Sequence, residues 1–212
     1  MSAPGVFIVF EGIDGSGKST QLRALSQRLQ QYGIDPVVIR EPGGTPVGEH
    51  IRQILLERPV GMEPLTELFL YEASRSELTR TVLRPALEAG RVVLSDRFAM
   101  ASLAYQGYGR GLDFTLVQKF NTIATDGIEP SLTIILDVPV EVALARKRQA
   151  FDRLERAGRE FHERVRRGYQ ELARHAPQNT LLLDGTRSES ELAEQIWQRV
   201  QALLIFTPSP EG

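Results

Sequence analysis

The chain contains no cysteine among its 212 residues. This absence excludes disulfide bonds and thiolate metal sites, and it is typical of proteins from a reducing compartment. The three histidines, His50, His162 and His175, lack the spacing of metal ligands, and we interpret them as solvent-exposed helix residues. No apolar run approaches the roughly 20 residues of a membrane-spanning helix, and a net charge of −2 gives no positive field for a nucleic acid. We therefore expect a cytoplasmic protein that binds neither a membrane nor a nucleic acid.

Short apolar runs alternate with longer amphipathic segments along the chain. The runs are continuous, as expected for strands of a sheet that is covered on both faces. They are Val6–Phe10, Val37–Ile39, Val92–Leu94, Leu132–Leu136 and Leu181–Leu183. Helices are expected at about residues 18–31, 47–57, 65–88, 113–126, 139–148, 159–174 and 189–204. The alternation predicts one α/β domain over residues 1–212, in three layers with a five-stranded parallel sheet in the middle.

Glycine-rich or charged loops follow the predicted strands. They lie at residues 12–17, 41–48, 107–111 and 149–158, and a tail at 207–212 is expected to be frayed. Because ligands of open α/β sheets bind at the carboxyl ends of the strands, these loops are the candidate site.

The strongest motif is G-I-D-G-S-G-K-S at residues 12–19, which matches the phosphate loop G-x-x-x-x-G-K-[ST] in full. A strand precedes it and a helix follows, so backbone N–H groups and the helix N-terminus can surround phosphate oxygens. Lys18 is expected on the β- and γ-phosphates of ATP and Ser19 on Mg²⁺. The predicted ATP-binding residues are Gly12, Ile13, Asp14, Gly15, Ser16, Gly17, Lys18, Ser19 and Thr20. Asp96, at the end of another buried run, is the expected acidic partner of the metal, although aspartate is also common in turns.

A phosphate loop alone specifies a nucleoside triphosphate and leaves the acceptor open. The guanine-reading motif N-K-x-D of GTPases is absent, and an ABC-type ATPase would need its signature motif and a longer domain. The acceptor therefore has to be inferred from the remaining segments.

Four further segments add arginines and aromatic residues. They are R-E-P-G-G-T at 40–45, Y-E-A-S-R at 71–75, D-R-F at 96–98 with A-S-L-A-Y-Q-G at 101–107, and F-D-R-L-E at 151–155. Through these segments, and over nearly its whole length, the chain resembles the bacterial type of the thymidylate kinases, a family of P-loop nucleoside-monophosphate kinases. The resemblance implies a P-loop fold with a short LID loop at about 149–158, Mg²⁺-dependent transfer of the γ-phosphoryl of ATP to dTMP on the route to dTTP, and a homodimer.

The resemblance also implies roles for single residues. The implied dTMP-binding residues are Asp14 at the sugar 3′-hydroxyl, Arg40 and Arg97 at the phosphate, Tyr71 and Arg75 at the thymine, Ser102 and Gln106 near the base edge, and Tyr105 against the deoxyribose. The implied catalytic residues are Lys18, Arg97, Asp14 and, in the LID, Arg153. Arg146 or Arg148 is implied beside the adenine or its phosphates. No general base is needed, because the acceptor phosphate is already ionised near pH 7.

Residue spacing agrees with part of this assignment. Tyr71 and Arg75 lie one helical turn apart and share a face, as an aromatic platform and a donor for a flat base would require. Without the resemblance we would interpret them as a core aromatic residue and a solvated arginine. The chain departs from the family pattern in having Tyr71 where phenylalanine is common. It also has Gly15 where the eukaryotic type has arginine, so positive charge is expected from the LID, which looks short.

Two other functions remain open from the sequence. One is a P-loop kinase for another nucleoside monophosphate or a deoxynucleoside. The other is a nucleotide-binding switch without acceptor chemistry, in which the acceptor-side arginines would have no evident purpose.

Overall fold

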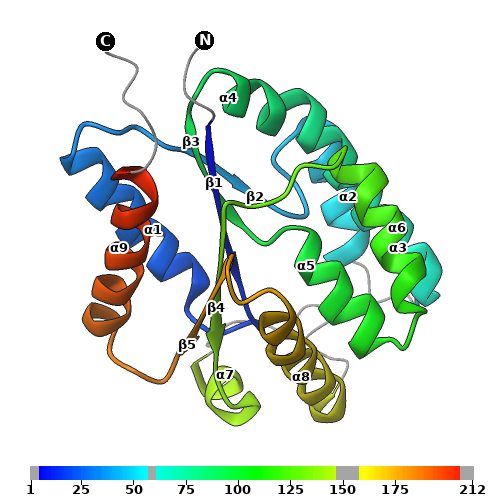
Figure 1. Ribbon diagram of the computed structural model, residues 1–212. Coiled ribbons are helices and arrows are strands. Elements are labelled where there is room, and N and C mark those ends of the chain that lie inside the picture. The colour runs from blue at the N-terminus through cyan, green and yellow to red at the C-terminus, as the bar shows by residue number, and fades with distance from the viewer. Residues whose placement is uncertain (1–4, 57–60, 147–157, 206–212) are drawn as a thin grey trace.

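The computed structural model describes residues 5–56, 61–146 and 158–205. Its centre is a five-stranded sheet in the order β2-β3-β1-β4-β5, and all its pairings are parallel (Figure 1). The strands are β1 (Val6–Glu11), β2 (Val37–Arg40), β3 (Val92–Asp96), β4 (Leu132–Asp137) and β5 (Thr180–Asp184). The predicted parallel sheet is therefore confirmed.

Helices cover both faces of the sheet, as the three-layer prediction requires (Figure 1). They are α1 (Lys18–Gln31), α2 (Pro46–Leu56), α3 (Pro64–Leu78), α4 (Arg84–Glu88), α5 (Ala99–Ser102), α6 (Phe114–Thr125), α7 (Val140–Arg146), α8 (Arg159–His175) and α9 (Glu189–Ile205), with π-helices η1 (Thr79–Leu83) and η2 (Leu103–Gly109). Helices α1 and α9 lie on one side of the sheet, and α3, α6 and α8 lie on the other. Within the described ranges, no helix has the length and apolar character required to cross a membrane.

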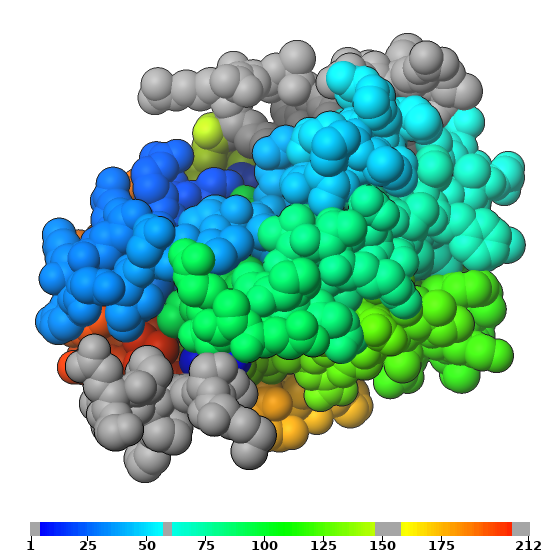
Figure 2. Space-filling view, turned by 90° about the horizontal axis from the view of Figure 1, so that it is seen from above, coloured from blue at the N-terminus to red at the C-terminus, as the bar shows by residue number. Residues whose placement is uncertain are grey.

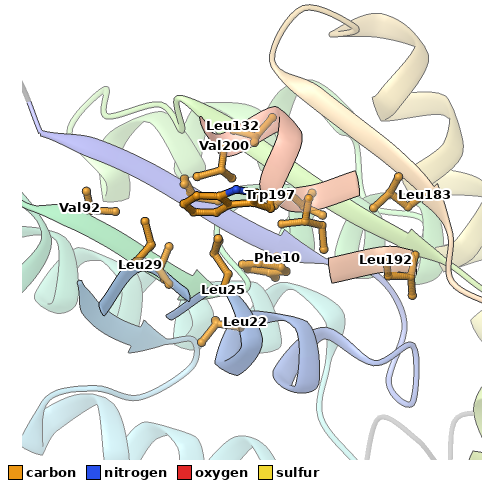
Figure 3. Packing of buried hydrophobic residues seen from close by; sticks show 14 of the residues in the cluster. Phe10, Leu22, Leu25, Leu29, Val92, Leu132, Leu183, Leu192, Trp197 and Val200 are labelled. Atoms are coloured by element: carbon orange, nitrogen blue, oxygen red, sulfur yellow. The ribbon is translucent and has the colours of Figure 1, made fainter. Parts of the chain in front are cut away.

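The side chains of β1 explain why its apolar run is continuous. Ile8 and Phe10 join a cluster with α1 and α9, in which Trp197 and Leu25 converge near Phe10 (Figure 3). The alternate residues Phe7 and Val9 join a second cluster on the opposite face. Because successive strand residues point to opposite faces, both sets must be apolar when both faces are covered.

The structure corrects the expected helices in two places. The segment 65–88 is helical but contains the π-helix η1 between α3 and α4. Residues 99–109, of which 107–109 were expected as loop, form α5 and η2. Gly109, the last residue of η2, lies so close to α8 that a Cβ there would be 2.7 Å from the Phe161 ring. Gly109, one of the glycines that suggested a loop, therefore permits close packing between helices, which the local sequence does not reveal.

The prediction of three solvent-exposed histidines is also wrong for His162. His50 and His175 are exposed, but His162 is buried in α8, with its ring 5.3 Å from that of Phe161. The segment that packs against α8 is distant from it in the sequence. The burial of His162 therefore could not be inferred from the sequence of α8 alone.

Candidate active site

A cavity of about 820 Å³ opens at the carboxyl ends of β1, β2 and β3. The phosphate loop lines it together with residues from α2, α3, α5, η2 and the segment after β5. Of the predicted site residues, those that line it are Asp14, Gly15, Ser16, Gly17, Lys18, Ser19, Thr20, Arg40, Tyr71, Asp96, Arg97, Ser102, Tyr105, Gln106 and Arg146. Segments far apart in the sequence therefore meet at one edge of the sheet, as expected for a parallel α/β fold.

The phosphate loop has the backbone that its glycines allow. Gly15 and Gly17 have φ angles of 82° and 99°, in the left-handed region that favours glycine. Gly17 caps the N-terminus of α1, where free N–H groups can bind an anion. Lys18 Nζ donates to the carbonyl oxygens of Gly12 and Ile13, at 3.1 and 3.0 Å. The pKa of Lys18 is lowered to about 8, mainly by burial and next by the neighbouring Arg97. A bound phosphate would raise this pKa.

Ser19 and Asp96 form the part of the site that could hold a metal. Ser19 Oγ donates to Asp96 Oδ2 at 2.7 Å. A hydroxyl and a carboxylate are hard oxygen ligands, and Mg²⁺ usually takes few protein ligands together with phosphate oxygens and water. The pair fits this chemistry, although the described residues contain no group of three or more histidine, aspartate or glutamate side chains able to hold a metal.

Arg97 joins the phosphate loop to the acceptor side. Its Nη2 donates to Asp14 Oδ1 at 2.6 Å and to the Tyr105 hydroxyl at 3.0 Å. Its Nη1 donates to the carbonyl of Gly12 at 3.0 Å and to the Tyr169 hydroxyl at 3.1 Å. The backbone of Arg97 has a φ of 74°, an unusual conformation for a non-glycine residue, and such strain is often found at functional sites.

The buried carboxyl of Glu11 is linked to Arg97 through the Tyr169 hydroxyl. It accepts from the Tyr169 hydroxyl at 2.7 Å and from the backbone N–H of Phe98 at 2.9 Å. Burial raises its pKa, while Arg97 acts in the opposite direction. Glu11 thus connects the first strand, the segment after β3 and α8 around the same arginine.

Arg75 lies behind the cavity wall and is only 1% exposed. Its guanidinium donates to the carboxylates of Glu41 and Glu72, both at 2.7 Å. The same guanidinium bonds Ser102 Oγ at 2.9 Å, Asn121 Oδ1 at 2.7 Å and the Phe98 carbonyl at 3.1 Å. A solvated helix arginine is thereby excluded. Ser102 and Glu41 line the cavity in front of it.

Two arginines lie at the acceptor end of the cavity. Arg40 lines the cavity, but its Nη2 is bound to both oxygens of Glu49, at 2.8 and 2.7 Å. Arg52 of α2 also lines the cavity, where Nη1 donates to the Pro42 carbonyl at 2.9 Å. Sequence reasoning missed Arg52, although a helix that follows a glycine-rich loop at a strand end was a place to look.

At the other end of the cavity, Arg146 Nη1 donates to the Gly185 carbonyl at 2.9 Å. Arg187 lies on the same wall and was also missed; its position in the loop after the last strand was the available signal. Arg148 and Arg153, like nearly all of the LID segment 149–158, lie outside the described residues, as does the tail 207–212.

One cavity thus contains a strand–loop–helix phosphate site, a hydroxyl–carboxylate pair and several arginines. This combination is typical of the P-loop phosphoryl-transfer enzymes. The family model described as thymidylate kinase matches residues 10–196. The chain belongs to the thymidylate kinase family, as the resemblance predicted.

Individual relatives agree with this assignment. A protein named thymidylate kinase from Deinococcus radiodurans is 50% identical over 198 residues, which cover 92% of this chain and 96% of that protein. Another from Desulforudis audaxviator is 50% identical over 211 residues, with coverage of 98% and 96%. The crystal structure of thymidylate kinase from Ehrlichia chaffeensis is similar with a TM-score of 0.76 and 32% identity, and covers 93% of this chain and 99% of that one.

The Tyr169 hydroxyl should stabilise the site. Tyr169→Phe should lower the free energy of unfolding by about 1–3 kcal/mol, because buried Glu11 loses a donor and Arg97 loses an acceptor. Tyr108→Phe is the matched control, since no hydrogen bond of the Tyr108 hydroxyl is found among the described residues. Urea unfolding of the two variants and the wild type measures the difference; equal stability of both variants contradicts the bridging role.

Proposed function

We propose that the chain transfers the γ-phosphoryl of ATP to dTMP, giving dTDP and ADP on the route to dTTP. The supporting observation is that one cavity contains both a phosphate loop and, beyond Arg97, a separate wall with an aromatic ring, amide and hydroxyl groups and further arginines. A switch protein without an acceptor would not need that second wall. Membership of the thymidylate kinase family supports the same reaction.

The donor occupies the phosphate-loop end in this proposal. Lys18 binds the β- and γ-phosphates once its bonds to the loop carbonyls are exchanged for phosphate oxygens. Ser19 and Asp96 hold Mg²⁺, which neutralises phosphate charge. Thr20 lies beside the phosphates, and Arg146 and Arg187 lie on the wall that leads to the adenine.

The acceptor occupies the other end. Arg97, fixed by Asp14 and two tyrosine hydroxyls, holds the phosphate of dTMP between the loop and the acceptor wall. Arg40 or Arg52 supplies a second cation. Arg52 has no carboxylate partner among the ion pairs of the described residues. Arg40 must first break its ion pair with Glu49. Tyr71 stacks on the base, Gln106 and Ser102 border its edge with Arg75 behind them, and Tyr105 packs against the deoxyribose.

The reaction itself needs alignment and charge stabilisation. Holding the two phosphates in line converts the transfer into an effectively unimolecular step. The loop contributes Lys18 as its side-chain cation, because residue 15 is glycine. We therefore assign Arg153 of the LID to the equatorial oxygens of the transferring group, where an arginine is typically worth ~10³–10⁵ in kcat.

ADP formation with a panel of nucleoside monophosphates tests the proposed acceptor. Mg²⁺-dependent ADP release should be fastest with dTMP and should return to the background rate when dTMP or Mg²⁺ is omitted. Faster release with another monophosphate or a deoxynucleoside would identify the alternative kinase. Release that is indifferent to every acceptor would indicate an ATPase or a switch.

We also propose that the chain forms a homodimer through an apolar face on α3 and α6. This face consists of Leu65, Phe69, Phe120 and Ile123, which follow each other at helical spacing on the two helices. Phe69 and Ile123 are 47% and 58% exposed, and the Phe69 and Phe120 rings meet at 5.1 Å. The two helices lie side by side at one flank of the molecule (Figure 2). Exposed apolar surface of this kind marks an interaction site.

Phe69→Glu should therefore convert the dimer into a monomer at micromolar concentration, because a charge would be buried without a partner. Leu182→Glu, at an exposed position on the edge strand β5, is the matched control and should remain dimeric. Sedimentation equilibrium measures both. A monomeric wild type, or a dimeric Phe69→Glu variant, contradicts the proposed face.

The expected cytoplasmic location stays a prediction, for which cell fractionation is the test.

A further inference from the structure

Glu11 is the last residue of β1, and its side chain is completely buried. It is 0% exposed and is not among the described residues that line the cavity, so it is not placed to touch a substrate there. Both of its carboxylate oxygens nevertheless accept hydrogen bonds from segments around the site. Oε1 accepts from the backbone N–H of Phe98 at 2.9 Å, and Oε2 accepts from the Tyr169 hydroxyl at 2.7 Å. Each of these bonds acts on Arg97 in a different way.

The bond to Phe98 fixes the backbone beside Arg97. The φ of 74° at Arg97 lies in the left-handed region, and a non-glycine residue stays there only where its surroundings enforce it. The Arg97 N–H donates to the Phe10 carbonyl at 2.9 Å, and Ser95 Oγ donates to the Arg97 carbonyl at 2.6 Å. The next N–H along the chain, that of Phe98, donates to Glu11. Of these three contacts, the one with Glu11 is made by a carboxylate.

The bond to Tyr169 sets the direction of the hydrogen bond between Tyr169 and Arg97. A tyrosine hydroxyl has one proton and can either donate to a neighbour or accept from it. Because the Tyr169 hydroxyl donates its proton to Glu11, its oxygen remains an acceptor for Arg97 Nη1, at 3.1 Å. Glu11 thus holds the guanidinium through one intermediate hydroxyl, while its other oxygen holds the adjacent backbone.

We propose that Glu11 is a positioning residue for the acceptor phosphate: its carboxylate keeps both the backbone and the guanidinium of Arg97 in the orientation that receives this phosphate. The inference rests on the proposed function, since it assumes that Arg97 binds the phosphate of the acceptor. It does not depend on which nucleoside carries that phosphate. An amide of the same shape cannot replace the carboxylate, because its NH₂ group would face a second donor on one of the two sides.

A purely structural role for Glu11 makes different predictions. If Glu11 only stabilises the fold, its replacement lowers the melting temperature and leaves the kinetics of the folded enzyme unchanged. If Glu11 instead supports the phosphate loop, which begins at the next residue, its replacement weakens ATP binding as well, since Lys18 bonds the carbonyl of Gly12. A positioning role on Arg97 affects the use of the acceptor and spares the binding of ATP.

The test compares Glu11→Gln, Tyr169→Phe, the double variant and the matched control Ser131→Ala. Ser131 Oγ accepts from the backbone N–H of Phe7 at 3.2 Å, near the amino end of the same strand β1. The control therefore also disturbs a side-chain acceptor of a backbone N–H, but at the end of β1 away from the cavity. For each variant, kcat and KM are measured with dTMP, the dissociation constant of ATP by titration, and the melting temperature by thermal unfolding.

Glu11→Gln should lower kcat/KM for dTMP roughly 10- to 100-fold, because a small misplacement of a substrate-positioning group costs up to about 10²-fold. The dissociation constant of ATP should stay within about threefold of the wild type. Tyr169→Phe should lower kcat/KM for dTMP by about three- to tenfold, since the carboxylate still holds the backbone. Ser131→Ala should keep kcat/KM within about twofold, whatever its melting temperature.

The double variant tests whether Glu11 acts through Tyr169. Its loss in kcat/KM should be smaller than the product of the two single losses, because the amide introduced at position 11 no longer faces a hydroxyl donor. Losses that multiply would show that the two residues act independently, and would overturn the proposal.

Two further results overturn the role of Glu11 alone. They are a Glu11→Gln variant whose kcat/KM for dTMP stays within about threefold of the wild type, and one whose ATP dissociation constant rises as much as kcat/KM falls. If Glu11→Gln does not fold, Tyr169→Phe decides, and an unchanged kcat/KM there contradicts the proposal. A wild type that phosphorylates another monophosphate instead of dTMP overturns the proposed function, and the same variants then test Glu11 with that acceptor.

Discussion

The hydrogen bonds of the Arg97 guanidinium connect the parts of the molecule that must act together. The guanidinium has four acceptors. The phosphate loop provides the carbonyl oxygen of Gly12 and a carboxylate oxygen of Asp14, and the other two are the hydroxyls of Tyr105 in η2 and Tyr169 in α8. A planar fork of donors can satisfy four acceptors at once, which the single ammonium of a lysine cannot do with the same geometry. The arginine thereby fixes η2 and α8 relative to the phosphate loop, and the proposed alignment of two phosphates depends on this connection.

The sheet makes this connection possible. Strand β1 pairs with both β3 and β4, so the loop after β1 and the Asp96–Arg97 pair at the end of β3 lie at neighbouring positions. The register places Phe10 opposite Asp96, one residue before Arg97. Helix α8 adds Tyr169 from the other end of the chain, and it directly follows the segment to which the LID was assigned.

Much of the fold was predictable because its signals are local. A continuous apolar run of five residues, such as Val6–Phe10, suffices to indicate a buried strand, and the phosphate loop carries its own glycines and lysine. The residues missed or misplaced depend on contacts between distant segments. His162 is buried by packing that its own helix does not encode, and the π-helix η2 forms where glycine suggested a loop. The position of Arg75 behind the wall likewise follows only from its hydrogen bonds to segments distant from α3, namely to Glu41 after β2, to Ser102 of α5 and to Asn121 of α6.

The function of Arg97 as the link between donor and acceptor is the central claim, and the kinetics of Arg97→Lys test it most directly. The substitution retains the positive charge but cannot keep four acceptors in place. We predict that kcat/KM for dTMP falls by at least ~10²-fold, comparable to the loss of one preorganised donor in an active site, while the dissociation constant of ATP changes less than about threefold. A variant whose kcat/KM stays within about threefold of the wild type would contradict this account of the site.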